Sequence, residues 1–473
     1  MNQNGIYKWA FINKVSVAII NFGVNIALAR MLTTSDFGLL AMIAIFTAVA
    51  YDLSNCGLAD GIIHKANPTD TDYSTVFVFN GALGLFFGLS FFLGAPLVAR
   101  FFGHEELIGI MRVLGVCFFF QTLSLIQETR LRKELKLKTI CFVHVGSTIT
   151  VSTLAIWAAA NGYGYKALIC TQILLSLVVF IFYAFTTRWF PRIRFSIKSF
   201  KELFSYGWHL LLSYLCNLIS VNVNTSFLGR YYPSPSMSGI YFQGAKLAAV
   251  PFKVSESSLN WPFFAVAANE TDPSKRRQLI CNMFSTILGI NGTLTLFLLV
   301  IVSPGIRLLY GDQWLGAIPI FRILALAQFF IALRNFFQTI CKVHGSTFFI
   351  RNMAFVELTV QLLLLFAFYR QGIVWIAWTQ SAGVFLSVTI YSLYCRKFMG
   401  MGMRQLLSSA ISTLSLPAIA AIAGTGTAIA LSSSSPLVGC IAIAIVFAAV
   451  VIALGEWKKP AFYLSIRRKL IKY

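Results

Sequence analysis

The sequence predicts an all-α polytopic membrane protein with about 14 transmembrane helices, arranged as two six-helix lobes and a peripheral C-terminal helix pair. Three observations lead to this fold class. Hydrophobic residues make up 58% of the 473-residue chain and charged residues only 11%, whereas soluble domains contain about 25% charged residues. Long apolar runs recur along the whole chain. The first half of the chain also resembles the second, which indicates an internal repeat.

The apolar runs set the number of helices. A helix needs roughly 20 apolar residues to cross a hydrocarbon layer of about 30 Å. The runs predict spans over 8–29, 37–56, 75–98, 107–128, 140–160, 165–186, 203–227, 238–265, 279–302, 318–341, 346–369, 373–395, 408–431 and 436–455.

The net charge of +22 follows the topology of these spans. If the N-terminus is cytoplasmic, most cations lie in the loops and termini on that side. The opposite loops hold only Arg30, Arg100, Lys166, Arg230, Arg307 and Arg370. Because cytoplasmic loops carry an excess of Lys and Arg, we expect both termini in the cytoplasm and membrane lipids at the basic tail. Nucleic acid is not an expected partner. The nine cysteines include no CxxC pair, so we expect no metal site.

Two alignments carry the repeat. Segment 95–116 matches 303–326, and segment 28–41 matches 228–242 more weakly. The matched pairs are Pro96 with Pro304, Gly103 with Gly311, Arg112 with Arg322, and Gly38 with Gly239. Since each half contains six spans, an even number, the two lobes are expected to run parallel, related by an axis along the membrane normal.

The repeat defines the domain organisation. We expect an N-terminal six-helix lobe over 1–186 and a C-terminal six-helix lobe over 203–397. Between them, 187–202 alternates cations with aromatic residues, which predicts an amphipathic cytoplasmic linker. Residues 398–457 hold two Ala- and Gly-rich helices outside the repeat, and 458–473 form the basic tail.

Four segments resemble a known family, the Wzx-type polysaccharide or oligosaccharide flippases of the polysaccharide transporter family. They are "LARMLTTSDFGLLAMIAIFTAVAYDLSNCGLADGIIHK" (28–65), "STVFVFNGALG" (74–84), "APLVARFF" (95–102) and "ETRLRKELKLKT" (128–139). The likeness extends over essentially the whole chain and is closest to the colanic-acid exporter branch. This family belongs to the multidrug/oligosaccharide-lipid/polysaccharide exporter superfamily.

The resemblance implies a transporter rather than an enzyme. Such a protein moves undecaprenyl-diphosphate-linked oligosaccharides to the periplasmic leaflet of the bacterial inner membrane by alternating access, for capsule, exopolysaccharide or O-antigen assembly. A polymerase and glycosyltransferases of the same pathway are then expected partners. The chain has no Gly-rich phosphate loop, so neither ATP nor another cofactor is expected.

Two lysines in the span 238–265 are the first candidates for substrate contact. Lys246 and Lys253 are seven residues apart and therefore share a helix face, which Gln243 extends. A charge in the membrane needs a partner or a wet cavity, and Pro251 between the lysines is expected to kink the helix. Lys253, Lys246 and Lys14 are the predicted diphosphate-binding residues. A purely structural ion pair remains the alternative for Lys253.

The repeat suggests which residue could form an ion pair with Lys253. The register that pairs Gly38 with Gly239 also places Asp52 opposite Lys253. We expect Asp52 and Lys253 to form a charge pair between the lobes in one state of the cycle and to separate when a diphosphate competes for the lysine.

Amide side chains are the second group of candidates. They lie on the first and seventh spans, which the repeat relates, and on the eighth. The predicted glycan-binding residues are Asn21, Asn25, Asn217, Asn224 and Gln243. Amides exchange hydrogen bonds with sugar hydroxyls without a charge penalty. Hydrogen bonding between packed helices is an equally good explanation.

The remaining intramembrane charges are expected to be structural. Arg112 and Arg322 occupy matching places, which favours an anchoring role, and Arg334 is expected to form a buried pair with Glu357. His144 lies singly in its helix, where either a proton relay or an ordinary hydrogen bond is consistent with the sequence.

Two other functions remain open. A cation-coupled multidrug antiporter of the same superfamily needs acidic residues in its cavity, and here the lysines match the acids in number. A polytopic glycan polymerase or ligase needs a long outer loop with catalytic side chains, and no predicted outer loop is long enough.

Overall fold

The computed structural model describes residues 3–55, 58–65, 67–187, 193–232, 234–400, 402–431, 435–458 and 463. Over these residues the chain is helical and has no strand, as predicted. The helices are α1 (Gln3–Met31), α2 (Thr34–Asn55), α3 (Leu58–His64), α4 (Asp70–Phe102), α5 (Glu106–Lys133), α6 (Leu137–Ala160), α7 (Tyr165–Thr187), α8 (Ile197–Tyr231), α9 (Pro235–Asn269), α10 (Pro273–Leu309), α11 (Ala317–Val343), α12 (Thr347–Phe368), α13 (Ile373–Met399), α14 (Met403–Ala430) and α15 (Pro436–Lys458).

Every predicted span corresponds to one long helix. Within the described residues, eleven helices are long and apolar enough to cross a membrane. The other three, α2, α8 and α9, fall outside that group, and α2 offers only a shorter apolar stretch, Thr34–Phe46. The chain is therefore a multi-pass membrane protein, and the count of fourteen spans stays a prediction.

The chain divides into two compact units, 1–239 and 240–473. In the first unit α4 packs along α5, α5 and α6 both pack against α7, and α1 packs against α6. The helix α8 belongs to this unit through its contacts with α2, α3 and α4. This compact unit extends beyond the predicted lobe 1–186, so the lobe boundaries drawn from the repeat remain a prediction.

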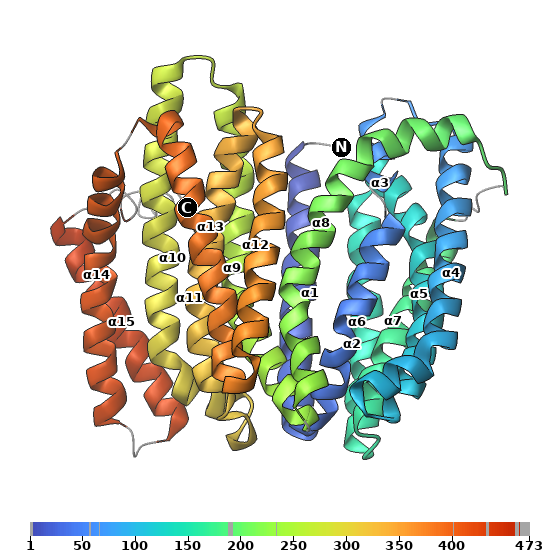
Figure 1. Cartoon of the computed structure of the whole chain (residues 1–473), viewed down its shortest axis with the longest axis horizontal. Coiled ribbons are helices and arrows are strands. Elements are labelled where there is room, and N and C mark those ends of the chain that lie inside the picture. Colours follow the sequence, from blue (N-terminus) through green and yellow to red (C-terminus); the bar gives the residue numbers. More distant parts are fainter. Residues whose placement is uncertain are drawn as a thin grey trace. The chain divides into compact units, whose positions relative to one another are not determined.

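The start of α8 includes part of the predicted linker. Ser196 caps the helix, its side chain accepting a hydrogen bond from the backbone N–H of Ser199. The first turns of α8 run crosswise to the rest of the helix in Figure 1. There Phe200 stacks on Phe204 and contacts Phe79 of α4. Residues 197–202 thus form the first turns of α8, and the amphipathic linker over 187–202 stays a prediction.

In the second unit α11 packs along α13, with α10 and α12 beside them. The last two helices, α14 and α15, pack against each other and against α10 (Figure 1). One glycine lies at this contact: a Cβ on Gly424 of α14 would lie 3.2 Å from the side chain of Val300 of α10. Close approach at small residues is common where membrane helices pack, and the assignment of 398–457 as an extra helix pair stays a prediction.

The same helix pairs recur in both units. The pairs α4–α5, α5–α7 and α6–α7 of the first unit have counterparts in α10–α11, α11–α13 and α12–α13 of the second. Local geometry recurs as well. Pro96 lies inside α4 and Pro304 inside α10, while Gly103 and Gly311, just beyond these helices, have φ of +78° and +90°. These correspondences support a parallel repeat.

Candidate functional site

The helix α9 exposes two cations on one face. Lys246 and Lys253 are both exposed and are separated by about two helical turns. The ammonium of Lys246 lies 6.0 Å from the centre of the Phe242 ring, in a cation–π arrangement. The helix continues through Pro251. The two predicted diphosphate-binding residues therefore share an exposed, positively charged face of a long helix.

A chain of polar contacts joins α9 to α11 and α12. Asn335 donates a hydrogen bond of 2.6 Å to the carboxylate of Glu256, which lies one turn beyond Lys253. The neighbouring Arg334 forms the expected ion pair with Glu357. The side chains of Arg334 and Glu357 are only 11% and 8% exposed. This pair is internal to the second unit, which favours the structural role expected for it.

Gln243 is buried on α9 without satisfying its amide. Its side chain is 1% exposed, and neither amide atom has a hydrogen-bond partner among the described residues. Further along α9, the Oδ1 of Asn260 is also buried without a partner within that part of the chain. Such groups cost about 1–3 kcal/mol each and often mark a place where water or a ligand binds.

The predicted amides on α1 and α8 lie in different environments. Asn25 of α1 and Asn224 of α8 are 8% and 0% exposed, whereas Asn21 is exposed, as is Lys14. The side chain of Asn217 lies outside the described residues. Burial of Asn25 and Asn224 fits the alternative of hydrogen bonding between helices, while Asn21 and Lys14 have accessible polar groups.

The expected charge pair between Asp52 and Lys253 is not tested by the structure. Asp52 lies in α2, and its side chain is outside the described residues. The pair therefore stays a prediction.

The two repeat-related arginines each contact the preceding long helix of their own unit. The guanidinium of Arg112 on α5 lies 4.9 Å from the centre of the Phe92 ring on α4. Arg322 on α11 donates a hydrogen bond of 3.1 Å to the hydroxyl of Ser303 on α10. Each arginine thus contacts a neighbouring helix, and the anchoring role of both residues stays a prediction.

One polar cluster was not predicted from the sequence. His144 of α6 lies between Glu128 of α5, Tyr183 of α7 and Asn13 of α1. Each of these residues is unremarkable by itself, and they come from four separate helices. The sequence singled out His144 by itself, and it offered a carboxylate, Glu128, at the end of a predicted span.

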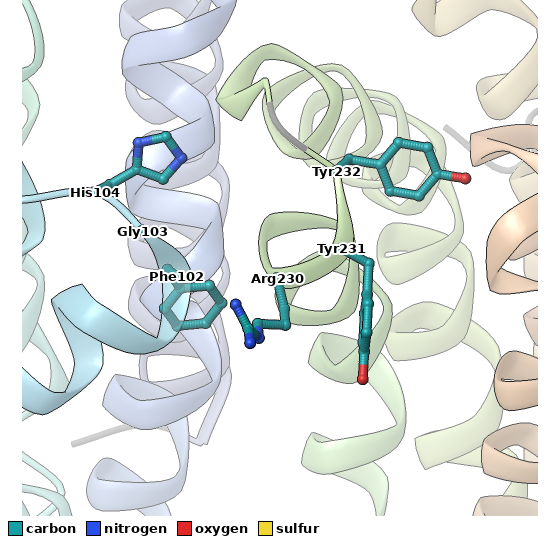
Figure 2. Close-up of a pocket in the computed structure, with 6 residues that line it drawn as sticks. All are labelled: Phe102, Gly103, His104, Arg230, Tyr231 and Tyr232. Atoms are coloured by element: carbon teal, nitrogen blue, oxygen red, sulfur yellow. The ribbon is translucent and has the colours of Figure 1, made fainter.

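A surface hollow of about 360 Å³ lies where α4 and α8 end. Figure 2 shows the guanidinium of Arg230 directed toward the Phe102 ring, with His104 nearby. Arg230 also lies 4.9 Å from the centre of the Phe101 ring. The six lining residues are Phe102, Gly103, His104, Arg230, Tyr231 and Tyr232. None of them was a predicted substrate-binding residue. Across the described residues, no three His, Cys, Asp or Glu side chains are grouped to hold a metal ion.

Known proteins resemble this chain in sequence. It is 25% identical to teichuronic acid biosynthesis protein TuaB of Bacillus subtilis (strain 168) over 331 residues, which are 69% of this chain and 68% of TuaB. It is 24% identical to lipopolysaccharide biosynthesis protein WzxC of Escherichia coli (strain K12) over 325 residues, 67% of this chain and 65% of WzxC. The matches thus span about two thirds of each relative.

The fold resembles that of a solved flippase. The lipid II flippase MurJ in an inward closed conformation matches with a TM-score of 0.74 at 14% identity, covering 95% of this chain and 99% of that one. Because the sequence identity is only 14%, this match is evidence for a shared fold and not for a shared substrate. Residues 27–319 match the family described as polysaccharide biosynthesis protein. Since this match covers more than half of the chain, the protein belongs to the polysaccharide biosynthesis protein family, as its resemblance to Wzx-type transporters predicted.

Proposed function

We propose that this protein flips undecaprenyl-diphosphate-linked oligosaccharides from the cytoplasmic to the periplasmic leaflet by alternating access. The product would serve the assembly of a surface polysaccharide such as capsule, exopolysaccharide or O-antigen. Membership of the polysaccharide biosynthesis protein family supports the pathway, and the MurJ-like fold supports a flippase architecture. The protein is then a transporter rather than an enzyme.

The observation that carries the proposal is the exposed lysine pair on α9. Lys246 and Lys253 share one face of a helix that lies among membrane-spanning helices. Cations in such a place are costly unless they meet water or an anion. A diphosphate offers two phosphate groups, and an ammonium binds each as a point charge. The sign of this face favours an anionic lipid headgroup over a cationic drug.

The glycan would contact amide side chains on α1, α8 and α9. Gln243 precedes Lys246 by one turn, and its amide is buried without a protein partner within the described residues. Asn21 on α1 is exposed. Sugar hydroxyls both donate and accept hydrogen bonds, as an amide does. We propose that Gln243 and Asn21, with Asn25, Asn217 and Asn224, provide hydrogen bonds to the sugar units.

The proposal includes a topology. The excess of Lys and Arg in alternate loops supports cytoplasmic termini and a location in the inner membrane. The lipid tail would remain in the bilayer while the headgroup crosses. The polymerase and glycosyltransferases of the same pathway would supply and use the substrate.

Deletion of the gene in its host tests the function. We expect undecaprenyl-diphosphate-linked oligosaccharides to accumulate on the cytoplasmic side. Mass spectrometry of extracted lipids measures their amount. A sugar-modifying reagent that cannot cross the inner membrane, added from the periplasmic side, should leave them unmodified. Complementation with wild type should restore export. An unchanged lipid-linked pool together with increased drug sensitivity would support a multidrug antiporter instead.

Substitution of Lys253 tests the site. Lys253→Gln should reduce export strongly, and Lys253→Arg should retain part of it because the charge is kept. Lys275→Gln, which removes an exposed cation from the start of α10, is a matched control and should export normally. Full export by Lys253→Gln at equal protein level would contradict the proposed diphosphate contact.

A further inference from the structure

Five side chains from four helices form a connected cluster around His144 in the first unit. The Nε2 of His144 lies 3.0 Å from the Tyr183 hydroxyl and 3.5 Å from a carboxylate oxygen of Glu128. Its Nδ1 lies 3.4 Å from the amide nitrogen of Asn13. Glu128 also accepts a hydrogen bond of 2.9 Å from Arg132. Both ring nitrogens of His144 are therefore engaged.

These contacts can accommodate His144 with either one or two ring protons. With Nδ1 accepting from the amide of Asn13, the ring proton is on Nε2 and faces Tyr183 and Glu128. The Oδ1 of Asn13 is buried and has no hydrogen-bond partner within the described part of the chain. Turning this amide over brings Oδ1 to Nδ1, where it accepts a hydrogen bond from the protonated ring. Asn13 can thus donate to the neutral ring through its amide nitrogen, and it can accept from the protonated ring through Oδ1.

One carboxylate contacts His144, and that carboxylate also pairs with Arg132. Glu128 is 16% exposed, while Arg132 is 56% exposed and reaches the end of the unit. Tyr183 on α7 is fully buried, and Cys141, on α6 like His144, is also buried. Tyr183 and Cys141 are neutral near pH 7. Glu128 is thus the anion that faces the imidazole.

Two further cations on these helices have other environments. Lys138 of α6 holds its ammonium 5.6 Å from the centre of the Trp9 ring, and Lys14 of α1 is exposed. His144 lies seven residues into α6, roughly 10 Å along the helix axis. Water at this end of the unit, where α5 ends and α6 begins, is therefore a near source of protons.

We propose that Glu128 and His144 form a binding site for a proton whose movement is coupled to transport. His144 takes one proton from water at this end of the unit and returns one after the conformational change, so only an N–H bond forms and breaks. The link to transport is α1, since Asn13 directly precedes Lys14, a proposed substrate contact. This coupling rests on the proposed function, whereas the proton site can be measured without substrate.

Proton binding is tested on the purified full-length protein by NMR of its five histidines. The His144 signal is identified by its loss in His144→Gln. We expect it to titrate between about pH 5 and 8, the range in which histidine changes charge. Glu128→Gln should shift the midpoint by about one pH unit or more, because a nearby charge moves a titration by that amount. A His144 signal that does not titrate in this range overturns the proposal.

Coupling is tested in everted membrane vesicles that contain the lipid-linked glycan. One pH unit across the membrane corresponds to a factor of about ten for each coupled proton. In wild type the equilibrium ratio of exported to unexported glycan should therefore change by about tenfold per pH unit for each coupled proton, and a protonophore should abolish this dependence. His144→Gln and Glu128→Gln should transport at a rate that no longer responds to the gradient.

The matched control is His344→Gln in the second unit. His344 contacts the carbonyl of Ile340 in its own helix at 2.9 Å and stacks on Phe398. This variant should keep the wild-type response. If His144→Gln also keeps it, His144 has a structural role and the coupling proposal fails. If wild type moves no lipid-linked glycan, the proposed function fails, and the NMR titration alone decides whether the proton site exists.

Discussion

Gly38 and Gly239 pack against each other at the first turns of α2 and α9, and each makes room for the other's helix. A Cβ on Gly38 would lie 1.9 Å from the carbonyl oxygen of Pro235, the first residue of α9. A Cβ on Gly239 would lie 2.0 Å from the carbonyl oxygen of Thr34, the first residue of α2, and 2.9 Å from the nitrogen of Gly38. This reciprocal pattern is that of a two-fold contact between equivalent surfaces.

The reciprocal contact supports the register of the internal repeat. The alignment that pairs Gly38 with Gly239 also pairs Thr34 with Pro235. Gly38 thus contacts Pro235, and Gly239 contacts Thr34, which is the residue equivalent to Pro235 in the other half of the repeat.

We expect Gly38→Ala and Gly239→Ala to destabilise this helix contact. The added methyl group overlaps backbone, which cannot move away as a flexible side chain can, and overpacking of this kind costs about 1–3 kcal/mol. Thermal unfolding of the detergent-solubilised protein should show lower midpoints for both variants. Gly94→Ala on α4, where a Cβ meets nothing within 4 Å, is the control. Equal midpoints for all three variants would show that the glycine contact does not contribute to stability.

The pair of Arg334 and Glu357 should behave as a buried ion pair. Arg334→Met leaves the carboxylate of Glu357, which is 8% exposed, without its partner and should cost about 3–5 kcal/mol. The double variant Arg334→Met with Glu357→Leu removes both charges and should recover most of that loss. A double-mutant cycle on thermal stability measures the coupling. A double variant that is less stable than either single variant would argue against this account.

Exchange of the charges of Asp52 and Lys253 tests their proposed pairing. The variant with Asp52→Lys and Lys253→Asp keeps one charge of each sign, so we expect normal protein level. Export should nevertheless fall, because the cation then lies on α2 instead of the exposed face of α9. Lys253→Asp alone should lower the protein level as well. Unimpaired export by the exchanged variant would rule out direct binding of the diphosphate by Lys253.

Lys65 should stabilise the end of the first unit over a wide pH range. Its ammonium lies 3.1 Å from a carboxylate oxygen of Asp72 and 3.1 Å from one of Glu202. Burial by itself favours the neutral amine, but the hydrogen bonds to Glu202 and Asp72 outweigh it and raise the pKa of Lys65. A raised lysine pKa stabilises the fold below the unfolded value, and that contribution is lost as pH rises through the folded value.

Lys65→Met should therefore destabilise the protein by about 1–3 kcal/mol, because it removes a partner of the almost fully buried Asp72. The difference from wild type should stay constant from about pH 6 to 9 and decrease only above about pH 10.5. Lys201→Met, at an exposed position of α8, is the control for loss of a cation. A difference that disappears below pH 9 would contradict the raised pKa.

Some contacts between helices could be predicted because few charges occur within the spans. Arg334 and Glu357 lie on consecutive helices, and each needs an opposite charge. Because few other charged residues occur within the spans, their pairing could be predicted. The cluster of Glu128, His144 and Asn13 could not be found in this way. Asn13 lies 131 residues from His144, and a histidine or an asparagine in a helix has many ordinary explanations.

The sequence alone determined the class of the protein and the position of its helices. In a bilayer every backbone N–H and C=O group must be hydrogen-bonded within the protein, and a long apolar segment achieves this by forming a helix. It also indicated the repeat, through pairs such as Gly103 and Gly311. Only the tertiary structure decided which side chains meet. Helix packing brings Gly38 to Pro235 and Asn13 to His144, since contacts between helices depend on the rotation and depth of each helix, which hydropathy does not encode.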